Sequence, residues 1–126
     1  MKLPRTAVTR VALAAIIIFA AITPLAAHHG WSSYEEAKTI ELTGVIEDSG
    51  YSNPHGFIRV RVDGEKGKTW LVILAPPSRM EARGLPAERL KKGETASVVG
   101  YPHREKDDEL RAERITIGGK TTELRQ

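Results

Sequence analysis

Apolar and polar residues alternate along most of the chain after residue 39, which is the pattern of half-buried β-strands. Turn-forming residues such as Gly, Pro, Asn and Asp separate the alternating runs, which together predict five strands. These strands cover residues 40–47, 58–62, 69–75, 94–101 and 109–117. A sixth, short strand is expected within residues 118–124 as part of a terminal hairpin. The run at 69–75 is apolar on both faces, so we expect it to be the most buried strand.

A short helix is predicted between the third and fourth strands, over residues 76–86. Ser78 is expected to cap its first turn, and Glu81, three residues later, completes a capping box. Gly84 supplies the left-handed residue that ends many helices, and Pro86 prevents the helix from continuing. A second short turn leads into the fourth strand.

The last long strand changes phase along its length. Leu110 and Ala112 keep one phase of the alternation, whereas Ile115 and Ile117 keep the other, so a β-bulge is expected near residues 113–114. Three strands, a short helix and two further strands follow the order of a Greek-key barrel of the oligonucleotide/oligosaccharide-binding (OB) type. We therefore predict an all-β protein with one short helix, a small OB-like barrel of five to six strands. The alternative is an open β-sandwich.

The first 27 residues predict an export signal. Three cations precede an apolar run that ends in small residues: Lys2, Arg5 and Arg10, residues 11–22, and Ala26-Ala27. Twelve apolar residues are too few to cross a bilayer core, which needs about 20. We expect cleavage after Ala27, localisation in the periplasm and contact with the membrane only during export. An uncleaved membrane anchor is the alternative. The mature protein then consists of an arm, residues 28–37, and a barrel domain, residues 38–126.

Removal of the signal changes the charge of the protein. The whole chain has 19 Lys and Arg against 16 Asp and Glu, a net charge of +3. The three excess cations all lie in the signal, so the mature part carries 16 of each sign. We therefore expect no nucleic-acid partner, because nucleic-acid phosphates demand a concentrated positive surface. The chain contains no cysteine, so its core must form without disulfides.

All four histidines lie outside the signal, at His28, His29, His55 and His103. OB barrels bind ligands on the face of strands two and three, between the strand 1–2 loop and the strand 4–5 loop. His55 is expected in the first of these loops and His103 in the second. The arm that carries His28 and His29 is long enough to reach across the barrel, at about 3.3 Å per residue. We expect the four histidines to converge there.

Such a cluster favours a metal ion. Imidazole suits copper, zinc and nickel, and Met80 is the only sulfur side chain of the mature part. Copper, as Cu(II), is therefore the expected ion, with zinc and nickel behind it. Cleavage after Ala27 would free the amine of His28, which could chelate the ion together with its imidazole and that of His55. Cleavage one residue earlier would instead place histidine third, a square-planar nitrogen set. The competing interpretation is that these histidines are solvated residues of an arm and its neighbouring loops.

Aromatic residues support a metal-free alternative. Tyr51, Asn53 and Phe57 are expected to contact a small ligand at the face of strands two and three. Trp31 and Tyr34 could anchor the arm to the barrel, or pack in its core. The sequence has no nucleophile elbow, H-E-x-x-H motif or phosphate loop. We therefore expect a binding protein rather than an enzyme; a copper oxidoreductase is the distant alternative.

Five segments resemble DUF6152, a family of unknown function. They are AHHGW, NPHGFI, LAPPSRMEARGL, LKKGETASVVGYP and ELRAERITIGGK. The resemblance covers nearly all of residues 26–126 and implies a small exported protein of a Gram-negative periplasm. It implies no activity. It includes His28, His29, Asn53, Pro54 and His55, whereas position 103 is not part of the pattern.

The first hypothesis is thus a periplasmic binding protein that holds a Cu(II)-type ion through histidines near the mature N-terminus and in the strand 1–2 loop. The second is a metal-free interaction or small-ligand-binding module of OB fold. The sequence leaves the ion, the ligand, any protein partner and the oligomeric state undetermined.

Overall fold

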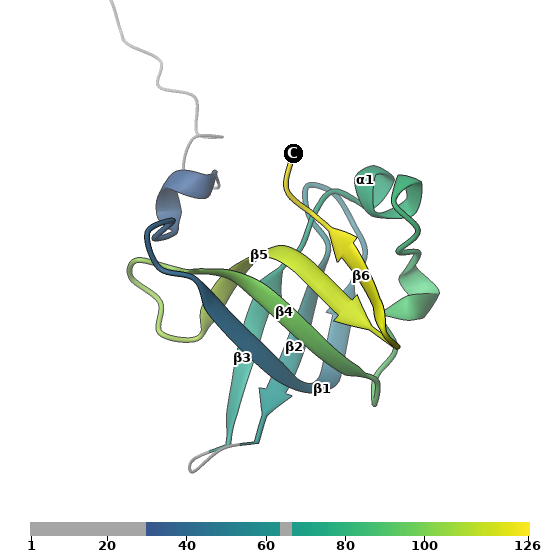
Figure 1. Ribbon diagram of the computed structural model, residues 1–126, viewed down its shortest axis with the longest axis horizontal. Coiled ribbons are helices and arrows are strands. Elements are labelled where there is room, and N and C mark those ends of the chain that lie inside the picture. Colours follow the sequence, from purple (N-terminus) through teal and green to yellow (C-terminus); the bar gives the residue numbers. More distant parts are fainter. Residues whose placement is uncertain (1–29, 64–66) are drawn as a thin grey trace, which may run out of the picture.

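A computed structural model of the chain describes residues 30–63 and 67–126 (Figure 1). The predictions for the signal, for cleavage after Ala27 and for His28 and His29 lie outside the described residues. The elements are the 3-10 helix η2 (Trp31–Ser33), β1 (Ile40–Gly50), β2 (Phe57–Val62), β3 (Lys68–Ile73), α1 (Pro77–Ala82), the 3-10 helix η3 (Ala87–Arg89), β4 (Thr95–Pro102), β5 (Glu109–Ile117) and β6 (Lys120–Glu123). Within these residues, no helix has the length and apolar composition needed to cross a bilayer.

The strands form one sheet in the order β3-β2-β1-β4-β5-β6, in which every neighbouring pair is antiparallel. A parallel pairing of β3 with β5, from Leu71↔Glu109 to Ile73↔Arg111, closes the first five strands into a barrel. β6 extends the sheet beyond β5 as an additional strand. This is the small Greek-key OB barrel that the sequence predicts, all-β with one short helix.

The core lies inside the barrel because one face of each strand carries apolar side chains. α1 and the turn after it close one end of this interior with Met80, Leu85 and Leu90, each at most 2% exposed. The largest fully buried strand residues are Ile46, Ile58, Val60, Val72, Val98, Leu110 and Ile115.

Three details of the prediction are confirmed. Val99 pairs with Arg114 and Gly100 with Ala112, so Glu113 is the extra residue of a β-bulge in β5. The terminal hairpin strand is present as β6. Gly84 follows α1 with a φ of +81°, the left-handed conformation that glycine adopts without steric cost.

The expected capping box is wrong. α1 begins at Pro77, Pro76 occupies the N-cap position, and no side chain caps the first turn. Ser78 therefore lies inside the helix. The physical reason is the Pro-Pro pair, since proline fits the first helical position and needs no hydrogen-bond partner for a backbone N–H.

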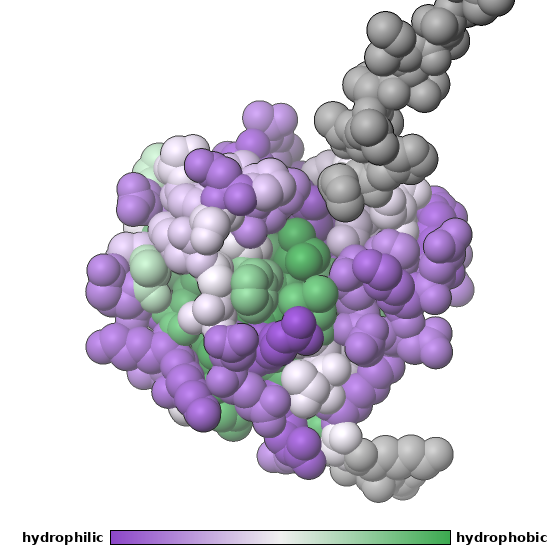
Figure 2. Space-filling view, turned by 180° about the vertical axis from the view of Figure 1, so that it is seen from behind, coloured by the Kyte–Doolittle hydropathy of each residue, from purple (hydrophilic) through white to green (hydrophobic). Residues whose placement is uncertain are grey.

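The expectation that the third strand is the most buried is also wrong. Within β3 only Val72 is fully buried, and Trp70, Leu71 and Ile73 are half-buried. β2 and β3 lie on the side of the barrel away from the viewer in Figure 1, and seen from behind an apolar area is visible there among hydrophilic side chains (Figure 2). Apolar residues on both faces of a strand do not ensure that both faces are covered.

Candidate functional site

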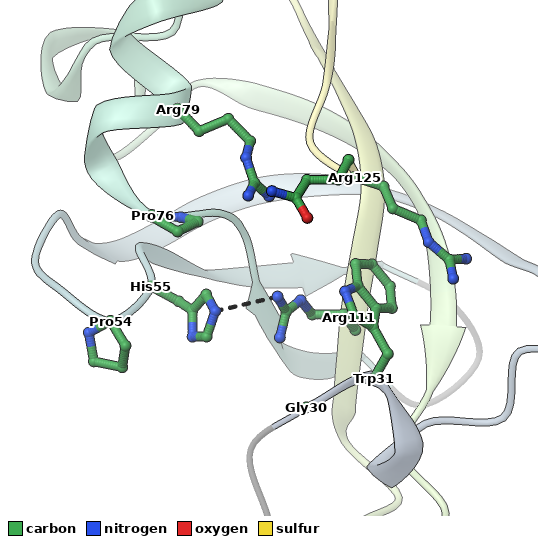
Figure 3. Close-up of a pocket in the computed structure, with 9 residues that line it drawn as sticks. Gly30, Trp31, Pro54, His55, Pro76, Arg79, Arg111 and Arg125 are labelled. Atoms are coloured by element: carbon green, nitrogen blue, oxygen red, sulfur yellow. Dashed lines mark hydrogen bonds between the residues drawn. The ribbon is translucent and has the colours of Figure 1, made fainter. Parts of the chain in front are cut away.

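A pocket of about 590 Å³ lies where the arm, the β1–β2 loop, the start of α1, β5 and the C-terminal segment meet. This volume lies in the range typical of small-ligand pockets. Figure 3 shows the side chains around it. The lining residues are Gly30, Trp31, Pro54, His55, Pro76, Arg79, Arg111, Arg125 and Gln126. Three of these nine residues are arginines, and none is an aspartate or a glutamate.

Arg111 is the most buried of the three arginines, with 5% of its surface exposed. Its guanidinium Nη2 lies 3.2 Å from Nε2 of His55 (Figure 3). Its Nε is buried and has no hydrogen-bond partner among the described residues. Within the same part of the chain, none of the ion pairs includes Arg111. The side chain is thus a buried cation that has no carboxylate partner within residues 30–63 and 67–126.

The electrostatic surroundings of Arg111 oppose its charge. Burial is the main cause that lowers the pKa of its guanidinium, and the like charge of Arg79 also lowers this pKa. Tyr34 raises it. Arginine nevertheless remains a cation at neutral pH because its ordinary pKa lies so far above 7. The pocket therefore holds a positive charge that no acidic residue in its lining balances.

The other two arginines, Arg79 and Arg125, both donate hydrogen bonds to oxygen atoms. Arg79, on α1, donates to the carbonyl oxygen of Leu124 at 3.1 Å. Arg125 donates to the carboxylate of Glu36 at 2.7 Å. The indole of Trp31 lies between Arg111 and Arg125, and each guanidinium carbon is 4.5 Å from the ring centroid (Figure 3). These cation–π contacts hold the two cations apart at fixed positions.

The arm is anchored to the barrel next to this pocket. Tyr34 is 5% exposed, and its hydroxyl donates to Glu109 Oε2 at 2.8 Å. Trp31 packs edge-on against Tyr101, with ring centroids 5.9 Å apart. Both aromatic residues thus dock the arm onto β4 and β5. In this position the arm covers the outward side of β5, which explains why Glu109 and Arg111 are buried there.

A second pocket of about 480 Å³ shares Pro54, His55 and Arg111 with the first. The structure therefore brings two of the candidate metal ligands, His55 and His103, to one pocket. The imidazole of His103 has partners of its own. The Nδ1 atom of His103 accepts hydrogen bonds from the backbone N–H groups of Glu105 and Lys106, both at 3.1 Å. Its Nε2 faces Glu109 Oε2 at 3.6 Å.

Neither of these two histidines belongs to a metal-binding cluster in residues 30–63 and 67–126. No group of three or more His, Cys, Asp or Glu side chains there is arranged to hold a metal ion. The Nε2 atom of His55 lies 3.2 Å from Nη2 of Arg111.

The three residues expected to contact a small ligand do not line the first pocket. The hydroxyl of Tyr51 donates to the carbonyl of Leu85 at 2.6 Å, so Tyr51 ties the β1–β2 loop to the segment after α1. Asn53 is exposed and precedes Pro54, which lines both pockets. Phe57 is half-buried, with its ring close to Gly50. Arg79, Arg111 and Arg125, which line the first pocket, were not among the site residues predicted from the sequence.

Comparison with known proteins gives a family and distant structural likenesses. A family model described as "Family of unknown function (DUF6152)" matches residues 15–111. No curated protein matches the chain significantly. A crystal structure of the S. pombe Stn1-Ten1 complex matches at 18% identity with a TM-score of 0.49, over 63% of this chain and 57% of that one. A crystal structure of TiaS in complex with an isoleucine tRNA and ATP matches at 20% identity with a TM-score of 0.48, over 73% of this chain and 20% of that one. The chain spans less than two thirds of either structure.

Proposed function

The chain belongs to the DUF6152 family, a family of unknown function, and we propose that it is a binding protein whose arginine-lined pocket holds a small anionic ligand. The observation that carries this proposal is Arg111, a cation 5% exposed that has no carboxylate partner in the described residues. An unpaired buried charge opposes folding by several kcal/mol. A bound anion would supply the missing partner.

The chemistry of the lining supports the same class of ligand. A guanidinium matches a carboxylate or a phosphate with two parallel hydrogen bonds. Such bonds are stronger in a partly buried pocket than in water, because the local dielectric constant is lower. Arg79 and Arg125 add positive charge on either side of Arg111 (Figure 3). The proposal involves binding alone and no reaction.

Isothermal titration calorimetry on the purified chain tests this proposal, in a buffer free of phosphate, sulfate and carboxylates. The probes are inorganic phosphate, sulfate, acetate, benzoate and phenyl phosphate. We expect at least one probe to bind. We expect Arg111→Met to weaken that binding about 10- to 100-fold, the equivalent of a lost charge-assisted hydrogen bond. Arg59→Met removes an exposed cation of β2 outside the pocket, and it should change the affinity less than about twofold. Absence of binding, or equal binding to Arg111→Met, would refute the proposal.

The proposal places the protein in the periplasm of a Gram-negative bacterium. Export is supported by the residues before position 28, which begin with basic residues, continue with an apolar run and end in small residues. A protein that binds small solutes would meet there the molecules that enter the periplasm. The mature protein would carry 16 cations and 16 anions on its side chains, so its affinity for anions would come from one pocket rather than from its net charge.

A copper site remains a second candidate because one observation favours it. Gly30 lines the pocket together with His55, and only His29 separates Gly30 from His28 in the sequence. Cleavage after Ala27 would free an amine on His28, two residues before Gly30 in the sequence. Against it, the three arginines of the lining would repel a divalent cation.

Titration of the processed protein with Cu(II), followed by visible d–d absorption, tests the copper site. We expect stoichiometric binding that is lost when the N-terminal amine is acetylated. The affinity should fall as the pH drops below about 6.5, because imidazole must be deprotonated to bind the ion. Binding that is indifferent to acetylation and to pH would exclude this site.

A further inference from the structure

We infer that the ligand of the arginine-lined pocket is an amphiphilic organic anion, a carboxylate or phosphate group carried on a compact apolar body. This inference rests on the proposed anion-binding function and specifies the class of ligand. It follows from the size of the pocket, from the distribution of charge in its lining and from the depth of Arg111.

The pocket is much larger than a bare anion. Its volume of about 590 Å³ corresponds to about 20 water molecules at roughly 30 Å³ each. Acetate or inorganic phosphate would leave most of this space filled with water. A ligand that fills the pocket needs a body of several more non-hydrogen atoms besides its anionic group.

The lining combines cationic and apolar groups with two polar side chains, His55 and Gln126. Pro54 and Pro76 present ring carbons on one side, and Arg79 and Arg111 present guanidinium groups across from them (Figure 3). The indole of Trp31 contributes further apolar surface next to Arg111. No acidic side chain of the lining could receive a positive group of the ligand. The complementary molecule is therefore negative at one end and mainly apolar over the rest.

The burial of the groups orients this ligand. Arg111 is 5% exposed, whereas Arg125 lies with about a third of its side chain in solvent. The anionic group would thus be held at Arg111, where water competes least for its hydrogen bonds. The apolar body would then lie against Pro54, Pro76 and Trp31, where its removal from water stabilises the complex.

Paired probes in the same calorimetric titration test the inference. Benzoate is compared with acetate, and phenyl phosphate with inorganic phosphate, so that each pair shares an anionic group and differs in its apolar body. We expect at least one aromatic member to bind more than about fivefold more tightly than its partner, and neutral benzamide to bind more weakly than benzoate. The pair that shows this advantage identifies the head group as carboxylate or phosphate.

A variant of the arm supplies an independent readout. Trp31→Ala should reduce the ratio of benzoate to acetate affinity, or the corresponding phosphate ratio, and Trp31→Phe should restore it. A ratio isolates the apolar contact even when the arginines shift slightly in the variant. An advantage below about fivefold in both pairs, or a ratio unchanged by Trp31→Ala, would overturn the inference while anion binding stands. Failure of every probe to bind would remove the proposed function itself.

Discussion

Arg111 lies at a position where a charged side chain opposes the stability of the fold. It is on β5, its outward side is covered by the docked arm, and its Nε has no partner in the described part of the chain. Replacement of a buried charged group by an apolar side chain of similar volume is often neutral or stabilising. The presence of an arginine at this position is therefore better explained by ligand binding than by folding.

We predict that Arg111→Met leaves the free energy of unfolding unchanged or raises it by about 1–2 kcal/mol in the absence of ligand. The measurement is urea denaturation of the variant and the parent protein at neutral pH. Arg114→Met on the same strand is the control, since it removes a more exposed cation that pairs with Glu123 at 3.0 Å. It should lower stability by less than about 1 kcal/mol. A loss above about 2 kcal/mol in Arg111→Met would mean that the guanidinium supports the fold.

The second prediction for a single residue concerns Tyr34 and the pH dependence of stability. Burial, followed by the hydrogen bond to Glu109, raises the pKa of its phenol well above the ordinary value of about 10. The folded protein therefore keeps this proton at a pH where the unfolded chain releases it. The stability that Tyr34 contributes is complete below about pH 10 and is lost as the pH rises above it.

For Tyr34→Phe we predict a loss of about 1–2 kcal/mol at about pH 7, because Glu109 loses a buried hydrogen-bond donor. We also predict a smaller further loss between about pH 9 and pH 11 than in the parent protein. Urea denaturation at several pH values measures both effects. Parallel declines of the two proteins above about pH 10 would contradict the prediction.

Among the structural elements, β4 and β5 position the arginine of the site. Gly100 on β4 faces the point where the Glu113 bulge changes the register of β5. A Cβ atom at this position would overlap the backbone carbonyl of Arg111. Only glycine allows the two strands to approach this closely, so the backbone of β4 determines where Arg111 enters the pocket.

We predict that Gly100→Ala separates β4 from β5 at Arg111. The expected results are a loss of about 1–3 kcal/mol in the free energy of unfolding and a weaker affinity for the best-binding anion. Denaturation and calorimetry measure the two effects on one preparation. Ser97→Ala on the same strand removes only an exposed hydrogen bond with Thr43 and serves as the control. Parent-like affinity in folded Gly100→Ala would show that the close approach has no part in the site.

The strands could be predicted from the sequence because alternation directly records which face of a strand lies in the core. The phase change between Ala112 and Ile115 even located the bulge. The burial of outward faces could not be predicted in this way. The outward residues of β3 stay half-exposed, whereas Arg111 on β5 is buried. β5 differs from β3 because the arm covers its outward face. The contact between Tyr34 of the arm and Glu109 of β5 joins residues that are 75 positions apart in the sequence.

The candidate site was predicted only in part for the same reason. His55 was expected in the β1–β2 loop, and it does line the pocket. His103 lies in the adjoining pocket, but the backbone of its own loop already uses its Nδ1 atom. Arg111 in an alternating strand has the pattern of a solvated residue. Its guanidinium is covered through long-range contacts, among them those with Trp31 and His55.

For the molecule as a whole, the closed barrel brings distant segments to one pocket. Residues of the arm, the β1–β2 loop, α1, β5 and the C-terminal segment all line it. Trp31 connects two of these segments directly because it lies between Arg111 and Arg125. The pocket therefore depends on how the arm docks onto the barrel.

We predict that the protein recovered from the periplasm of a Gram-negative host lacks residues 1–27. The basic start, the short apolar run and the small residues ending at Ala27 favour cleavage there. Intact-mass spectrometry of the exported protein measures the new N-terminus, with the cytoplasmic fraction as the control. The formal side-chain charge should fall from +3 to 0, since three cations and no anions are removed. A full-length mass in the exported fraction would instead indicate an uncleaved anchor, and it would remove the free amine of His28 on which the copper site depends, while the arginine-lined pocket would be unaffected.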